Sequence, residues 1–163
     1  MKKYLFIVAI FILLPSIGNA MMPKADFVLV VKSQKRLYLE RANKILKSYR
    51  VVFGANPVGH KRMEGDERTP EGIYTLDYKL KKSEFYKAIH ISYPNSADIL
   101  KAKELGVDPG GSIMIHGQPN DCYWPPVVTQ YFNWTDGCIA VSNSDMDEIW
   151  EAVDEGTPIR ITP

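Results

Sequence analysis

The sequence predicts a mainly β fold, either a β-sandwich or a partly closed barrel, with two short helices. Short segments rich in β-branched and aromatic residues recur along the chain, with turn-forming residues between them. Only two segments carry the capping residues of a helix. No internal repeat or linker divides residues 21–163, a length that suits one domain with one core. By content the fold is α+β.

The strands are predicted from runs of apolar or alternating residues bounded by turns. A Ser-Gln-Lys turn at 33–35 separates the first two runs, and a Pro-Glu-Gly turn at 70–72 leads into the fourth. The expected strands are residues 27–32, 36–40, 49–53, 72–78, 88–92, 112–116 and 158–162.

The two helices are predicted from their ends. Asn95 is a suitable N-cap for a helix over 96–105, which Gly106 ends. Ser144 is the expected N-cap of a second helix over 145–154, with Gly156 beyond its end.

The first twenty residues have the pattern of a secretory signal peptide. Lys2 and Lys3 precede an unbroken apolar run at 4–14, and Ala20 offers a small residue for cleavage. Such a run rises only about 16 Å as a helix, about half of a hydrocarbon core, so we expect no stable membrane insertion after signal cleavage. We therefore expect one domain over 21–163 that is exported to the periplasm or cell envelope.

The charge of the chain is nearly balanced. The formal net charge is +1, and removal of Lys2 and Lys3 with the leader makes it −1. No basic block or aromatic-basic stripe is present, so we expect no nucleic-acid partner. The sequence carries no signal of oligomeric state.

Two polar elements point to thiol chemistry. Cys138 follows Gly137, a residue that permits a tight turn and backbone N–H groups aimed at an oxyanion. A free thiol is mostly protonated at neutral pH, so a nucleophilic cysteine needs a base. His116 ends an apolar run just before Gly117 and is the best candidate for that base, although a buried structural histidine fits the same pattern.

An ordered set of motifs resembles the L,D-transpeptidase catalytic domain, also called the YkuD domain. The motifs extend over nearly all of the chain after the leader. They are residues 54–61 (GANPVGHK), 69–74 (TPEGIY), 91–95 (ISYPN), 116–117 (HG) and 135–138 (TDGC).

This resemblance implies roles for four residues. Cys138 would be the nucleophile and His116 the general base and acid, with the backbone carbonyl of Gly117 orienting the imidazole and the N–H of Gly137 in the oxyanion hole. The substrate would be a peptidoglycan stem peptide, cleaved after diaminopimelate through a thioester. The acyl acceptor stays open among a diaminopimelate amine, a protein lysine and water, which would make the protein a hydrolase. No metal or organic cofactor is expected.

Four further residues are candidates for substrate binding: Tyr93, Trp134, Asp136 and Asn143. Aromatic side chains more often serve packing, and Asn143 is also a candidate for helix capping. Asp136 replaces a histidine that many family members carry, which affects substrate handling rather than the thiol. It is equally suited to capping its own turn.

Three rival interpretations remain. A disulfide between Cys122 and Cys138 would mask the nucleophile, since export favours disulfides. A zinc site would have to use His90, His116 and Asp136 with the two cysteines, but the sequence lacks the close ligand spacing of zinc motifs. A non-catalytic wall-binding module is the third.

Overall fold

One curled sheet forms the framework of the protein. The computed structural model describes residues 22–163, and the expected signal peptide lies outside the described residues. The eight strands lie in the order β3-β2-β1-β8-β4-β5-β6-β7. They are β1 (Phe27–Val31), β2 (Arg36–Arg41), β3 (Lys44–Arg50), β4 (Gly72–Ser83), β5 (Tyr86–Ile91), β6 (Met114–His116), β7 (Ile139–Ala140) and β8 (Thr157–Thr162).

The sheet closes on itself in part. Most neighbouring strands are antiparallel, whereas the pairs β1–β8 and β6–β7 are parallel. The chain leaving β3 reaches the opposite edge strand, because Val52 forms an isolated antiparallel bridge with Ala140 of β7. Gly54 forms a second bridge with Thr135. The prediction of a mainly β, partly closed barrel is confirmed, and one sheet rather than two packed sheets makes it.

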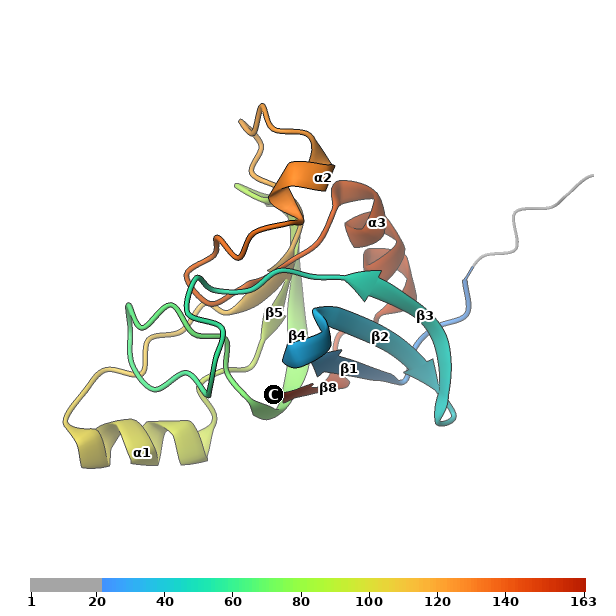
Figure 1. Cartoon of the computed structure of the whole chain (residues 1–163). Helices are drawn as coiled ribbons and strands as arrows, with labels where there is room; N and C mark the ends of the chain where they lie inside the picture. The colour runs from blue at the N-terminus through green and yellow to red at the C-terminus, as the bar shows by residue number, and fades with distance from the viewer. Residues whose placement is uncertain (1–21) are drawn as a thin grey trace, which may run out of the picture.

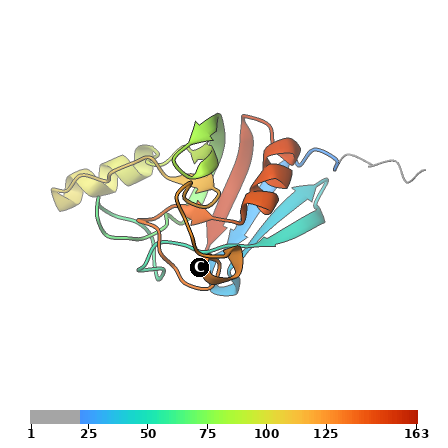
Figure 2. The same cartoon turned by 90° about the horizontal axis from the view of Figure 1, so that it is seen from above.

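The core lies inside the curl of the sheet. Alternate residues of β1, including Val28 and Val30, are fully buried, as a strand with one face on a core requires. Helix α3 (Asn143–Ala152) packs against the sheet and buries Met146 and Ile149 (Figures 1 and 2). In contrast, α1 (Ser96–Leu105) projects from the body of the domain (Figure 2).

The ends of α1 are those predicted. Asn95 accepts hydrogen bonds from the backbone of Ala97 and Asp98, and the Asp98 carboxylate accepts from the N–H of Asn95 to complete a capping box. Gly106 ends the helix in the left-handed region with φ 68°.

The predicted start of the second helix was wrong by two residues. Ser142, rather than Ser144, caps α3, and its hydroxyl accepts from the N–H of Asp145 at 3.1 Å. Ser142 directly follows β7 with an extended backbone, so it is the residue at which the chain turns into the helix. The four-residue helix α2 (Pro126–Thr129) and the short 3-10 helix η1 (Lys32–Gln34) were not predicted.

The third strand also differs from its prediction. It was expected over 49–53, but β3 covers Lys44–Arg50 and Val52 forms only an isolated bridge. The residues at the start of β3 are mostly exposed, so they lack the apolar alternation by which a strand is predicted from sequence.

Candidate active site

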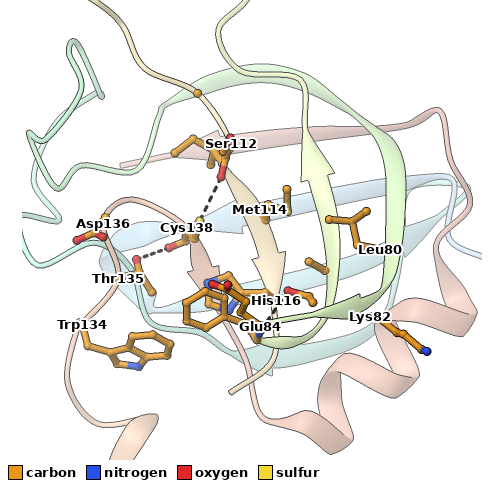
Figure 3. Close-up of a pocket in the computed structure, with 15 residues that line it drawn as sticks. Leu80, Lys82, Glu84, Ser112, Met114, His116, Trp134, Thr135, Asp136 and Cys138 are labelled. Atoms are coloured by element: carbon orange, nitrogen blue, oxygen red, sulfur yellow. Dashed lines mark hydrogen bonds between the residues drawn. The ribbon is translucent and has the colours of Figure 1, made fainter. Parts of the chain in front are cut away.

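A pocket of about 770 Å³ opens at one end of the sheet, beside β6 and β7. Its walls come from the end of β4, the β4–β5 turn, the segment that enters β6, and the segment that enters β7 (Figure 3). The lining residues are 80, 82–85, 88, 111–114, 116, 134–136 and 138. Cys138 and His116 therefore line the same pocket.

The pairing of β6 with β7 explains why these two residues share a wall. Ile115 lies beside Ile139 and His116 beside Ala140 in this parallel pair. The same register, extended by one residue, places Cys138 beside Met114. Because side chains alternate along a strand, Met114 and His116 point to one face, and Cys138 joins them there. All three line the pocket.

A tight turn presents Cys138 to the pocket. The Thr135 hydroxyl donates to the carbonyl of Cys138 at 2.8 Å and accepts from the N–H of Gly137 at 3.2 Å. Gly137 has a φ of 131°, and a Cβ at this position would lie 2.5 Å from the carbonyl oxygen of Arg68. Only glycine fits both the backbone conformation and the space.

The surroundings of the Cys138 sulfur keep it protonated. Burial raises the pKa of the thiol above its ordinary value, and the charge of Asp136 raises this pKa further. A backbone hydrogen bond from Met114 and the charge of Lys61 act in the opposite direction. The thiol donates to the carbonyl of Ser112 at 3.6 Å (Figure 3). Such a thiol needs a base before it can attack.

His116 is in the protonation state that a general base requires. Its Nδ1 lies 2.7 Å from the carbonyl oxygen of Gly117. A carbonyl only accepts, so Nδ1 carries the proton and Nε2 is left as the basic nitrogen. The side chain is buried, and burial lowers the pKa of His116 below its ordinary value, although the Gly117 hydrogen bond opposes this. The imidazole is therefore neutral near pH 7.

Two aromatic rings hold the imidazole. The ring of Phe85 lies 4.6 Å from that of His116 between centroids, and Trp134 makes an edge contact at 5.8 Å. Trp134 was singled out in the sequence, whereas Phe85 was missed. The one feature of the sequence that could have identified Phe85 is the presence of an apolar ring at a turn between two strands, where polar residues are usual.

Backbone contacts fix the segment that follows His116. The N–H of Gly117 lies 3.0 Å from the carbonyl of Phe85 and 3.2 Å from that of Lys87. The Asn143 side chain accepts from the N–H of Gln118 at 2.8 Å. A Cβ on Gly117 would lie 2.5 Å from this Asn143 oxygen, so the close packing requires glycine.

A comparison with known protein families decides the assignment. The model of the YkuD family, the L,D-transpeptidase catalytic domain, matches residues 25–161. The chain belongs to this family. The resemblance seen in the motifs is thereby confirmed, and so is the expectation of its fold.

Individual relatives agree with the assignment to the L,D-transpeptidase family. YafK of Escherichia coli K12, classed among the L,D-transpeptidases, is 33% identical over 111 residues, which are 67% of this chain and 37% of YafK. The helical cell shape determining protein Pgp2 of Campylobacter jejuni is 26% identical, with a TM-score of 0.61 over 88% of this chain and 51% of Pgp2. An L,D-transpeptidase of Xylanimonas cellulosilytica shares the fold at 14% identity, with a TM-score of 0.54 over 85% of this chain and 61% of that one. This chain thus spans about half or less of the length of YafK and Pgp2.

The four predicted substrate-binding residues of this L,D-transpeptidase domain divide into two pairs. Trp134 and Asp136 line the pocket. Tyr93 does not; it is buried, and its hydroxyl donates to the carbonyl of Pro109 at 3.0 Å. Asn143 also lies outside the pocket lining, where it holds Gln118 rather than capping α3.

Asp136 does not cap its own turn, because the Thr135 hydroxyl has that role. Its side chain is exposed at the rim of the pocket (Figure 3). Within residues 22–163 it has no hydrogen-bond or ion-pair partner, His116 included. Its carboxylate is therefore available to a substrate.

The two cysteines are not joined. Cys122 and Cys138 are both free in the structure, and the Cys122 thiol lies 3.8 Å from the carbonyl oxygen of Trp124. Residues 22–163 contain no cluster of three or more His, Cys, Asp or Glu side chains that fits a metal ion. In the same range, no helix has both the length and the apolar character needed to span a membrane.

Three other polar residues in or next to the motifs have structural partners. His60 pairs with Asp98 at 3.1 Å, and His90 pairs with Asp77 at 2.6 Å. Lys61 is buried and pairs with Asp66 at 2.9 Å. Both residues of this ion pair belong to the same long loop, and the sequence does not show that the loop folds so as to bring them together.

Proposed function

We propose that this domain is a peptidoglycan L,D-transpeptidase that works through a thioester on Cys138. The observation that supports this most strongly is one pocket with two groups on its wall: a half-buried thiol and a neutral imidazole whose Nδ1–H is held by the Gly117 carbonyl. Membership of the L,D-transpeptidase family supports peptidoglycan as the substrate, and we propose that the acyl donor is a diaminopimelate-containing stem peptide.

In the proposed first step, Nε2 of His116 takes the proton of the Cys138 thiol as the sulfur attacks the carbonyl carbon of diaminopimelate. The carbonyl becomes an oxyanion, and the bond to D-Ala then breaks. The His116 proton passes to the departing amine, which leaves D-Ala neutral at that nitrogen and the acyl group as a thioester.

In the second step an acceptor amine attacks the thioester and gives its proton to His116. The sulfur departs and regains that proton, so the enzyme returns to its starting state. A diaminopimelate amine gives a cross-link and a protein lysine gives an attachment. Water gives hydrolysis by the same route, which is the alternative activity for this domain.

Oxyanion stabilisation is the part of the mechanism that requires a rearrangement. The N–H of Gly137 donates to the Thr135 hydroxyl at 3.2 Å, near the long limit for such a bond. We propose that the developing oxyanion takes this N–H in place of the hydroxyl, because a charged acceptor forms the stronger hydrogen bond.

The place of action follows from the substrate. We propose that residues 1–20 are a signal peptide and that the domain acts in the cell envelope. The relative Pgp2 is a cell shape determining protein, which is consistent with a role in remodelling the wall.

The experiment is an analysis of products. Purified protein is incubated with isolated peptidoglycan, and the digested fragments are separated and weighed by mass spectrometry. The proposal predicts loss of D-Ala from tetrapeptides, with new cross-links if an amine is the acceptor and tripeptides if water is. Cys138→Ala and His116→Ala should give neither product.

The second cysteine of the chain provides the matched control. Cys122→Ser removes a thiol outside the pocket and should keep the products of the wild-type protein. If wild-type protein binds peptidoglycan without changing any fragment, the domain is a wall-binding module and the proposal is wrong.

A further inference from the structure

The long loop between β3 and β4 (Figure 1) is organised around one carboxylate, that of Asp66. Its Oδ2 accepts from the N–H of Arg62 at 2.7 Å and from the N–H of Met63 at 3.3 Å. Its Oδ1 accepts from the N–H of Arg68 at 3.1 Å and from the Lys61 ammonium at 2.9 Å. Burial alone would raise the pKa of Asp66, but these hydrogen bonds bring it below its ordinary value. A charged carboxylate therefore fixes the backbone of the loop.

This loop packs directly against the turn that presents Cys138. A Cβ on Gly137 would lie 2.5 Å from the carbonyl oxygen of Arg68. A Cβ on Gly54 would lie 2.0 Å from the carbonyl oxygen of Glu67 and 3.0 Å from the backbone nitrogen of Gly137. Glu67 itself has a φ of 55°, a strained conformation that persists only where the surroundings impose it. The backbone of the loop is thus the support on which the nucleophile turn rests.

The same loop contacts a second segment beside the nucleophile. The N–H of Glu64 donates to the carbonyl of Asp108 at 2.8 Å, and a Cβ on Gly110 would lie 3.2 Å from the Cβ of Glu64. This segment continues to Ser112, whose carbonyl accepts from the Cys138 thiol. The loop therefore supports both segments that hold the sulfur in place.

Lys61 brings a positive charge into this support. It is only 3% exposed, and its ammonium donates to Asp66 and to the carbonyl of Met63 at 3.1 Å. Burial raises the pKa of the Cys138 thiol; of the two charged side chains that act on the thiol, Asp136 adds to this shift and Lys61 opposes it. A buried charge is screened little by solvent, so the effect of Lys61 persists at physiological salt.

We propose that Lys61 and Asp66 are a positioning pair for the nucleophile. Asp66 fixes the loop that supports the Gly137 turn, and the Lys61 ammonium that it holds favours the thiolate form of Cys138 when His116 takes the proton. Neither residue lines the pocket, so the pair acts on the reacting group and not on the substrate. This rests on the proposed function and adds to it the residues that set the reactivity of the sulfur.

The test measures the reactivity of the thiol and needs no peptidoglycan. In Cys122→Ser protein Cys138 is the single cysteine. Its alkylation by iodoacetamide is followed by intact mass over a range of pH, because the thiolate is the form that reacts. Lys61→Met removes the positive charge. Lys61→Met/Asp66→Asn removes both charges, so that no buried carboxylate is left unpaired and the fold is spared that cost.

Lys32 provides the matched control. It is also buried, and it pairs with Glu71 at 2.7 Å, but its charge is not among those that act on the Cys138 thiol. Lys32→Met breaks a buried ion pair just as Lys61→Met does, so both should lower the Tm. Thermal unfolding of each variant therefore separates a loss of stability from a loss of charge near the sulfur.

Lys61→Met should slow alkylation at pH 7 roughly three- to tenfold and move the midpoint of the pH profile upward, because a charge that favours the thiolate is gone. The double variant should change in the same direction, and Lys32→Met should leave the profile where it is. In Lys61→Met kcat for D-Ala release should fall with the alkylation rate, whereas KM should not change, since Lys61 does not contact substrate.

An unchanged pH profile in the double variant would overturn the inference, and so would an equal shift in Lys32→Met. Release of D-Ala from a stem tetrapeptide by the wild-type protein is read separately. If the wild-type protein releases none, the proposed function is wrong, whereas the alkylation profiles decide on the positioning pair in either case.

Discussion

Asn143 offers a sharp test of how the protein positions its base. Its side-chain oxygen accepts the N–H of Gln118, next to the glycine whose carbonyl holds His116. Asn143→Ala leaves that N–H unsatisfied in a residue that is only 6% exposed. The cost is about 1–3 kcal/mol of folding free energy. A loss of about 2 kcal/mol lowers the Tm of a domain this size by about 4–8 °C.

The effect on catalysis follows from the same contact. Without Asn143 the Gly117 carbonyl is free to shift, and a misplacement of about 1 Å in a catalytic group costs on the order of a hundredfold in rate. We expect kcat for D-Ala release to fall about 10- to 100-fold in Asn143→Ala. Asn143→Asp keeps an oxygen that accepts the same N–H and places an anion in the first turn of α3, so it should keep most of the stability and rate.

Thermal unfolding and steady-state kinetics on the three proteins separate this role from substrate binding. A residue that contacts only substrate would raise KM, leave Tm unchanged, and respond to the new charge in Asn143→Asp. If Asn143→Ala has the same Tm and the same kcat as the wild-type protein, the positioning role is wrong.

Three further outcomes are expected. Phe85→Ala removes the ring beside His116 and should lower kcat about 3- to 10-fold, on the scale of one aromatic contact, whereas Phe85→Leu should lose less; equal loss in both would contradict a packing role. Gly137→Ala combines a φ of 131° with a contact of 2.5 Å to the Arg68 carbonyl and should cost roughly 2–4 kcal/mol in denaturant unfolding. Gly65→Ala, where φ is 75° with nothing within 4 Å, should cost only about 1–2 kcal/mol, and equal costs would show that the contact is unimportant. Because burial lowers the pKa of His116 and the neutral imidazole is the active form, kcat/KM should hold as pH falls to 6.5 and drop only below it; an acid limb with its midpoint above 6.5 would contradict this.

Local patterns predicted the elements that depend on local physics. The alternation of β1 and β2 and the caps of α1 were visible because they repeat within a few residues. The parallel pairing of β1 with β8 joins the two ends of the domain, and no local pattern encodes it. The start of β3 was not predicted because its residues are mostly exposed to solvent and therefore lack an apolar alternation.

The candidate site divides in the same way. Cys138 and His116 were found because their residue types carry the chemistry and stand beside glycines in recognisable motifs. The burial of Tyr93 and the placement of Phe85 on the imidazole depend on which side a loop or turn faces, and tertiary packing decides that. Residue type alone therefore predicted the reacting groups better than it predicted their surroundings.

The central claim is that the sulfur of Cys138 carries the acyl group. Intact-mass spectrometry on protein mixed with a stem tetrapeptide ending in diaminopimelate–D-Ala tests it directly. The account predicts an adduct equal to the peptide less D-Ala on the wild-type protein and on Cys122→Ser, and none on Cys138→Ala. An adduct that survives in Cys138→Ala, or that appears on Cys122 instead, would contradict it.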